Sequence, residues 1–172
     1  MTNEISIRHA KPEDMESFRA LRLEALKNHP DVFGWAYSEA AAKEADFWVN
    51  RLKMEPSVEA LFFAEQDSQL VGLTGIRRDM AVKAKHAADI WGVYVKPEYR
   101  GQHISEALIH TCLEWAKGNK EIVIVKLAVV THNIPALRCY ERCGFTTYGT
   151  DPKAICNEGI YYDEYLMSLE IK

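Results

Sequence analysis

The sequence lacks several features that would assign it to a class of proteins at once. No apolar run approaches the roughly 20 residues that a helix needs to span a bilayer, and the first residues contain no apolar signal region. The Gly-x-Gly-x-x-Gly fingerprint of dinucleotide sites and the Gly-Lys-Ser/Thr ending of a Walker phosphate loop are both missing. We therefore expect a cytoplasmic protein with no membrane partner, and a nicotinamide-dependent or ATP-dependent enzyme is disfavoured.

Cysteine is also scarce, and its spacing indicates no familiar site. Four cysteines occur among 172 residues, and none has CxxC spacing. Cys139 and Cys143 lie four residues apart on one face of a predicted helix, with His132 nearby. They supply at most part of a metal site, which needs about four well-placed ligands. We therefore expect buried free thiols and no metal, while a thiol-based metal or redox protein is a further reading that rests on Cys139 and Cys143 alone.

Charge of one sign is not in large excess either. The formal net charge is −4, and 27% of the residues are charged against 48% that are hydrophobic, a balance typical of globular proteins. Five basic residues between positions 77 and 86 form a cluster that is too short to reverse the overall sign. We therefore expect no nucleic-acid partner. The length suits a single domain covering residues 1–172 with one sizeable core.

The apolar pattern predicts helices and strands along the whole chain. In order, the expected elements are a strand at 5–7, a helix from Pro12 to before Pro30, a loop at 31–42 leading into a second helix that ends before Pro56, a hairpin with strands at 60–65 and 70–77, a strand at 89–95, a helix at 105–117, a strand at 122–130, a helix from Pro135 that Gly144 ends, and strands at 145–148 and 161–171. A helix joins the strands at 89–95 and 122–130, so we expect them to be parallel. The order predicts one α+β domain with a mixed sheet.

Residues 89–107 organise this plan. Their first part is a strand, and a turn and a short polar loop at 100–105 then lead directly into a helix. The first amides of a helix have no partner within the helix and lie at the positive end of its dipole. A strand, a tight loop and a helix N-terminus in succession therefore predict a site for a phosphate-bearing ligand.

Two patterns carry residues suited to chemistry. The first is the loop Arg100-Gly101-Gln102-His103-Ile104-Ser105, preceded by Val95-x-Pro97-x-Tyr99. The second is Asn133-x-x-Ala136-x-x-x-Tyr140-x-x-x-Gly144-Phe145. Together, in this order, they resemble the GNAT superfamily of acyl-CoA-dependent N-acyltransferases, and the order of elements agrees over nearly the whole chain. The second pattern matches the family's pattern at every position. The first departs from it at His103 and Ser105, where the family usually has glycines.

The resemblance implies a fold and an activity. The fold is a GNAT-like mixed sheet of about six to seven strands with a splayed central parallel pair, flanked by about four helices. The activity is transfer of an acetyl group from acetyl-CoA to a primary amine by direct attack, with a small molecule or a peptide as the acceptor and no metal. The alternative is a non-catalytic acyl-CoA-binding or regulatory domain of the same fold. The exposed final strands suggest a homodimer.

The resemblance also assigns roles to particular residues. Val93, Tyr94 and Val95 would hold the pantetheine arm and the thioester through their main chain, where Gly92 permits a bulge. The CoA-binding set is completed by the pyrophosphate loop and two residues of the later helix: Arg100, Gly101, Gln102, His103, Ile104, Ser105, Asn133 and Ala136. Tyr140, which also contacts the cofactor, would protonate the leaving sulfur, because a phenol with a pKa of about 10 is protonated at neutral pH.

A carboxylate is expected to act as the general base on the acceptor amine. The candidates are Asp89 on the central strand and Glu39 in the aromatic segment that precedes the second helix. Acidic and aromatic side chains gather in and after that segment, and they favour a cationic amine acceptor by charge and by cation–π contact. These residues are Trp35, Tyr37, Glu39, Glu44 and Asp46.

Overall fold

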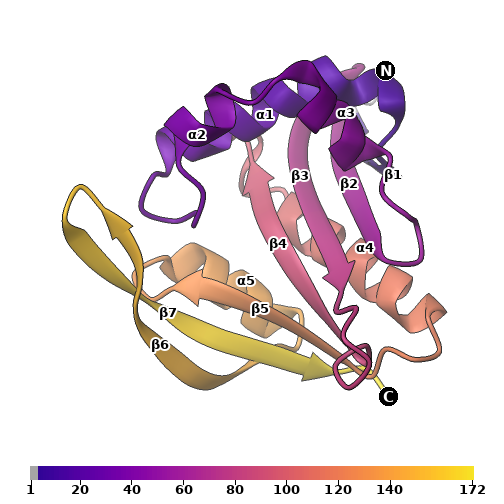
Figure 1. Ribbon diagram of the computed structural model, residues 1–172, viewed down its shortest axis with the longest axis vertical. Helices are drawn as coiled ribbons and strands as arrows, with labels where there is room; N and C mark the ends of the chain where they lie inside the picture. Colours follow the sequence, from indigo (N-terminus) through magenta and orange to yellow (C-terminus); the bar gives the residue numbers. More distant parts are fainter. Residues whose placement is uncertain (1–3) are drawn as a thin grey trace.

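The computed structural model describes residues 4–172, in which seven strands form one mixed sheet with helices on both faces (Figure 1). The strands are β1 (Ser6–His9), β2 (Glu59–Gln66), β3 (Gln69–Arg78), β4 (Ala87–Val95), β5 (Ile124–Val130), β6 (Thr146–Asn157) and β7 (Ile160–Glu170). The helices are α1 (Met15–Asn28), α2 (Tyr37–Ala41), α3 (Ala45–Leu52), α4 (Ile104–Gly118) and α5 (Ile134–Arg142), with short 3-10 turns η1 (Pro12–Asp14) and η2 (Pro97–Tyr99). The strand order is β1-β2-β3-β4-β5-β7-β6. The predicted α+β class and the mixed sheet are confirmed.

The centre of the sheet is the parallel pair β4 and β5, which α4 connects as predicted. The ladder between them is short: Ala87–Asp89 pair with residues 124–126, and the two strands then diverge into a wedge (Figure 1). β5 continues to pair with β7 along its whole length. The splay implied by the family resemblance is therefore present, and it leaves one edge of β4 without a strand beside it.

A bulge in β4 accompanies the splay. Leu73 of β3 pairs with Tyr94, but Gly75 pairs with Trp91, so two residues of β4 face one residue of β3. Gly92 lies inside this bulge with φ of +68°, a backbone conformation that costs glycine little. The bulge expected at Gly92 is thus observed, and it bends β4 where the gap to β5 opens.

Both faces of β2 and β3 are covered, which explains why these strands are almost continuously buried. Side chains alternate between two cores. Phe62 packs into the core shared with α4, which includes Leu108 and Ile109. Its neighbour Phe63 packs into the opposite core with Phe18 of α1 and Trp48 of α3. The two cores hold α1 and α4 on opposite faces of β2 and β3.

Two regions differ most from the sequence-based expectation, while the other elements begin or end within about three residues of it. The segment at 31–42, expected as a loop, contains the short helix α2. The strand expected at 145–148 continues as β6 through Asn157, so the loop expected at 149–160 is largely strand. Register shifts after Thr147 and after Asp151 accommodate the glycine and proline there. Bulges and prolines are tolerated because β6 is an edge strand of the sheet. No helix among residues 4–172 is long and apolar enough to cross a membrane.

Gly75 provides a test of how closely β3 and β4 approach. A Cβ atom added at Gly75 would lie 2.2 Å from two ring atoms of Trp91. We expect Gly75→Ala to lower the free energy of unfolding by about 1–3 kcal/mol through overpacking, and to change the tryptophan fluorescence, as urea titration and emission spectra can measure. Gly118→Ala is the control, because a Cβ at Gly118 meets no atom within 4 Å. Equal stability of both variants would show that the Trp91 ring moves aside freely.

Candidate active site

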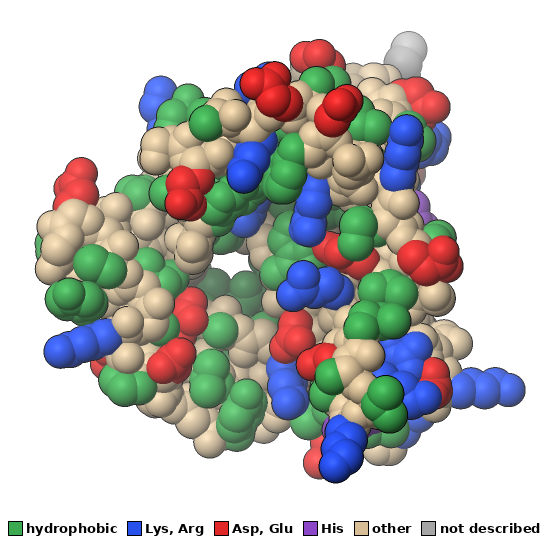
Figure 2. Space-filling view, in the orientation of Figure 1, with side chains coloured by type: hydrophobic (Ala, Val, Ile, Leu, Met, Phe, Trp, Pro, Cys, Tyr) green, Lys and Arg blue, Asp and Glu red, His purple; other side chains and the backbone are tan. Residues whose placement is uncertain are grey.

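A cavity of about 590 Å³ occupies the gap between β4 and β5. Residues 90–95 of β4 and 127–130 of β5 form its walls, and the first turns of α4 and α5 border it. Figure 2 shows an opening between the two halves of the molecule with hydrophobic side chains around it. The volume is in the range of small-molecule and cofactor sites, about 300–1,000 Å³. The predicted arm-binding residues Val93, Tyr94 and Val95 all line it. Their strand edge has no β5 partner, so its peptide groups can bond to a ligand.

The N-terminus of α4 closes one end of the cavity. The amide of Ala107 donates to the carbonyl of His103 at 3.0 Å, so the amides of Ile104, Ser105 and Glu106 precede the first intrahelical bond. All three residues line the cavity, as do Gly101 and His103. Gln102 is exposed and does not belong to the lining. The loop therefore has the geometry of an anion site, formed by main-chain donors at the positive end of a helix.

The two departures from the family's glycine pattern have different structural consequences. His103 caps α4 with φ of 58° and ψ of 19°, in the left-handed region that favours glycine. Its side chain is 75% exposed, and Nδ1 lies 3.2 Å from the carboxylate of Glu106. Ser105 lies inside the right-handed helix. Only His103 therefore occupies a position where the backbone itself favours glycine.

Arg100 connects the loop to β4 and to the end of α1 through hydrogen bonds of its guanidinium group. Its Nε donates to the carbonyl oxygen of Val95 at 3.0 Å, and Nη2 lies 3.1 Å from Nε2 of His29 at the end of α1. Burial, followed by the charge of Arg100, lowers the pKa of His29, which favours the neutral ring as the acceptor of this bond. Arg100 thus places a cation at the cavity and also connects three elements around it.

Helix α5 supplies the other wall residues that the sequence predicted. Oδ1 of Asn133 accepts a hydrogen bond from the amide of Ala136 at 3.3 Å, which caps the helix. Tyr140 is 7% exposed and lines the cavity. Burial, with smaller contributions from Cys139 and Cys143, raises the pKa of Tyr140. The phenol is therefore protonated across the neutral range, as a proton donor requires.

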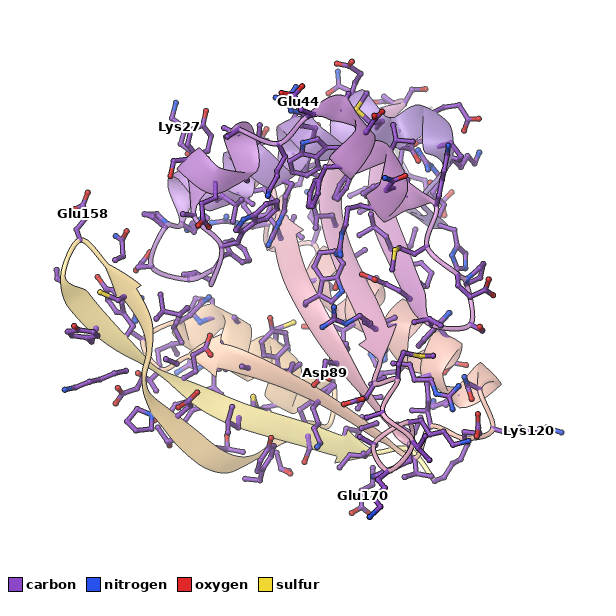
Figure 3. The ribbon with its side chains drawn as sticks, in the orientation of Figure 1. Lys27, Glu44, Asp89, Lys120, Glu158 and Glu170 are labelled. Carbon is purple, nitrogen blue, oxygen red and sulfur yellow. The ribbon has the colours of Figure 1, made fainter. Side chains whose placement is uncertain are left out.

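The two predicted carboxylate bases lie apart from this wall. Asp89 is at the closed end of the wedge, in the last paired position between β4 and β5 (Figure 3). Glu39 is exposed on α2. Neither residue belongs to the cavity lining. Glu44, which precedes α3 as its N-cap, and Asp46 in the first turn of α3 are both exposed, and Figure 3 shows Glu44 at the outer surface of the molecule. The structure thus brings Tyr140 together with the loop but not with these carboxylates.

The cavity also contains titratable residues that the sequence analysis did not select. His29, Asp31, Glu106 and His132 line it. Nε2 of His132 lies 2.9 Å from the carboxylate of Asp31, although 101 positions separate the two residues. No local pattern signals such a pair. Cys139 and Cys143 are buried on α5, and residues 4–172 contain no group of three or more His, Cys, Asp or Glu side chains that could hold a metal ion.

Comparisons with known proteins agree with this geometry. A model of the acetyltransferase (GNAT) family matches residues 16–145. The L-amino acid N-acetyltransferase AaaT of Escherichia coli is 27% identical over 166 residues, which cover 96% of this chain and 98% of that protein. The chain spans less than half the length of several other relatives, which are named mycothiol acetyltransferases.

Solved structures share the fold over nearly the whole chain. An acetyltransferase of the GNAT family from Streptococcus pneumoniae has a TM-score of 0.86 at 21% identity, covering 98% of this chain and 100% of that one. A structure from Salmonella typhimurium that contains its cofactor acetyl-CoA has a TM-score of 0.85 at 15% identity, covering 98% of this chain and 95% of that one.

The backbone difference between His103 and Ser105 can be tested with glycine at each position. We expect His103→Gly to raise the free energy of unfolding by about 0.5–1 kcal/mol, because glycine relieves the left-handed strain. Ser105→Gly should lower it by up to about 1 kcal/mol, because glycine weakens a right-handed helix. Urea titration of the two variants gives the comparison. A loss of stability of the same size in both would contradict the left-handed conformation at His103.

Proposed function

Because the chain belongs to the GNAT family of acetyl-CoA-dependent acyltransferases, we propose that it transfers the acetyl group of acetyl-CoA to a primary amine by direct attack. The observation that carries this proposal is the cavity between the splayed strands, which combines a free strand edge, a helix N-terminus and the protonated, buried Tyr140. When bound, acetyl-CoA supplies an activated thioester carbonyl. The residues present fit such a molecule, because an extended arm and a phosphate group need these two kinds of main-chain donor.

In this proposal each side of the cavity binds a different part of acetyl-CoA. The main chain of Val93, Tyr94 and Val95 bonds to the arm and fixes the thioester beside the bulge. The pyrophosphate lies at the amides that begin α4, with Gly101 and Arg100 beside it. The Asn133 cap sets the start of α5, and Ala136 leaves room for the arm. These contacts position the reacting carbon and contribute to catalysis by orientation.

The proposed chemistry requires one proton donor on the leaving side. The amine nitrogen forms a bond to the acetyl carbon while the carbon–sulfur bond breaks. The hydroxyl of Tyr140 donates its proton to the departing sulfur, which avoids the release of a free thiolate. The neutral amine loses one proton as it becomes the amide, and this proton passes through solvent to the Tyr140 oxygen, so that free thiol and amide are the products and the phenol is restored. Glu39 and Asp89 do not line the cavity, so the proposal does not use them as bases in direct contact with the amine. The similarity to the L-amino acid N-acetyltransferase of Escherichia coli supports a small-molecule acceptor.

Release of free thiol from acetyl-CoA in the presence of a panel of primary amines tests the proposal. We expect saturable release that depends on the amine, together with one molecule of acetyl-CoA bound per chain in calorimetry. Tight binding without release on any amine would support the non-catalytic acyl-CoA-binding domain instead. Absence of binding would contradict both functions.

Tyr140→Phe tests the role of the hydroxyl. We expect kcat to fall by about 100-fold or more, the usual size of a general-acid contribution, while the Kd of acetyl-CoA from calorimetry changes little. The raised pKa keeps the phenol protonated, so Tyr140 should cause no loss of wild-type kcat between pH 7 and pH 9. Tyr148→Phe, on the exposed side of β6, is the matched control. Equal kcat in Tyr140→Phe and wild type would remove Tyr140 from the mechanism.

A further inference from the structure

A second pocket, of about 230 Å³, opens on the sheet face that α1 and α3 cover. Its lining consists only of aromatic side chains, among them Trp35, Phe47 and Trp91, and of the two arginines Arg22 and Arg51. In Figure 2, Lys and Arg side chains are interspersed with hydrophobic ones beside the central opening on this side. Rings around one buried and one half-buried guanidinium group suit a ligand that is apolar at one end and anionic at the other.

Arg22 is the unusual member of this pocket. The residue is 8% exposed, and its Nη1 is buried without a hydrogen-bond partner among residues 4–172. Its guanidinium lies over the ring of Phe33 at 4.8 Å and that of Trp91 at 5.9 Å. Burial, and then the charge of Arg51, lower the pKa of Arg22 to about 10, so it is still a cation at neutral pH. A buried cation without a partner is costly, and an anion that enters the pocket removes that cost.

Within residues 4–172, Arg51, unlike Arg22, has a carboxylate partner. Its Nη2 pairs with the buried carboxylate of Glu59 at 3.0 Å, and its guanidinium lies 4.8 Å from the ring of Trp91. The described part of the chain thus places two guanidinium groups at the pocket and pairs one of them. The acids that the sequence analysis associated with a cationic acceptor, at Glu39, Glu44 and Asp46, line neither cavity. The local charge of the pocket is therefore positive.

The aromatic pocket and the main cavity meet at β4. Trp91 lines both. A Cβ added at the next residue, Gly92, would lie 3.2 Å from Nη1 of Arg22, so the unpartnered nitrogen lies against the bulge itself. The strand residues that follow are those proposed to hold the thioester. A ligand bound to Arg22 therefore lies next to the part of β4 that is proposed to hold the thioester.

We propose that the aromatic pocket binds the acceptor and that the acceptor is an amine with a carboxylate on the neighbouring carbon and an apolar side chain. The carboxylate bonds to the guanidinium of Arg22, whose planar fork matches two carboxylate oxygens. The apolar side chain packs among Trp35, Phe47 and Trp91. The amine, one carbon away from the carboxylate, then faces the main cavity. This assignment rests on the proposed acetyl transfer and names the substrate class of that site as apolar α-amino acids.

Matched sets of amines test the carboxylate requirement. L-phenylalanine and L-leucine are each compared with their carboxamide and with the corresponding amine that lacks the carboxylate, by thiol release from acetyl-CoA. We expect kcat/KM for the amino acids to exceed that for both analogues by about 10- to 100-fold, the usual effect of hydrogen bonds to a charged group. Arg22→Gln should lower kcat/KM for the amino acids to the level of their analogues and leave kcat/KM for the analogues unchanged. Arg22→Lys should restore part of the difference between amino acids and analogues. Arg77→Gln, at an exposed arginine of β3 outside both linings, should keep the wild-type preference.

Binding separates this inference from the acetyl transfer on which it rests. Calorimetry with L-phenylalanine, at saturating CoA, needs no turnover, and thermal melting by circular dichroism verifies that each variant is folded. Arg22-dependent binding of L-phenylalanine without turnover of any amine would support the pocket assignment and contradict acetyl transfer. Turnover of carboxylate-free amines as fast as amino acids, unchanged in Arg22→Gln, would overturn the assignment and leave acetyl transfer standing. If L-phenylalanine neither binds nor reacts and L-leucine does not react, the assignment is also overturned.

Discussion

The incomplete ladder between β4 and β5 is the constraint on which the rest of the structure depends. Three residues of β4 pair with β5, and the strands separate where the bulge at Gly92 turns the backbone. In an ordinary parallel sheet the next peptide groups would bond to each other and leave no space. Here the separation creates the main cavity, exposes a strand edge inside the protein and brings Trp91 against the helices of the other face. Both candidate binding regions thus originate from one local departure from regular pairing.

Local patterns predicted the parts of the fold and site that depend on neighbours in sequence. The helix α5 was predicted from Pro135 in its first turn and from Gly144 as its terminator, and Gly144 has φ of +96°. The cap at Asn133 was not predicted, because the family resemblance assigned this residue to the arm of CoA. The long strand β6 was missed, because glycine and proline usually indicate loops and an edge strand with bulges accepts them.

Tertiary packing decided the features that local patterns did not. No pattern in the sequence distinguishes Arg22 from the other charged residues of α1, and the packing of α1 and α3 around Trp91 buries it. The acidic segment near Glu39 suggested a cationic acceptor because sequence proximity was taken as spatial proximity. In the structure those acids are exposed, and the charge that the pocket presents is carried by Arg22 of α1 and by Arg51 in the last turn of α3. A net charge of −4 therefore says little about the sign of the field inside one pocket.

The short ladder has a mechanical consequence. The chain passes once, between α4 and β5, from the half that contains β1–β4 to the half that contains β5–β7. Beyond the three paired residues, a ligand that lies in the wedge replaces the missing rungs between the halves. The stability gained on binding is then shared by two halves that are joined by these three paired residues and by one apolar core. Under the proposed function, acetyl-CoA bound in the wedge would take the place of a strand beside β4.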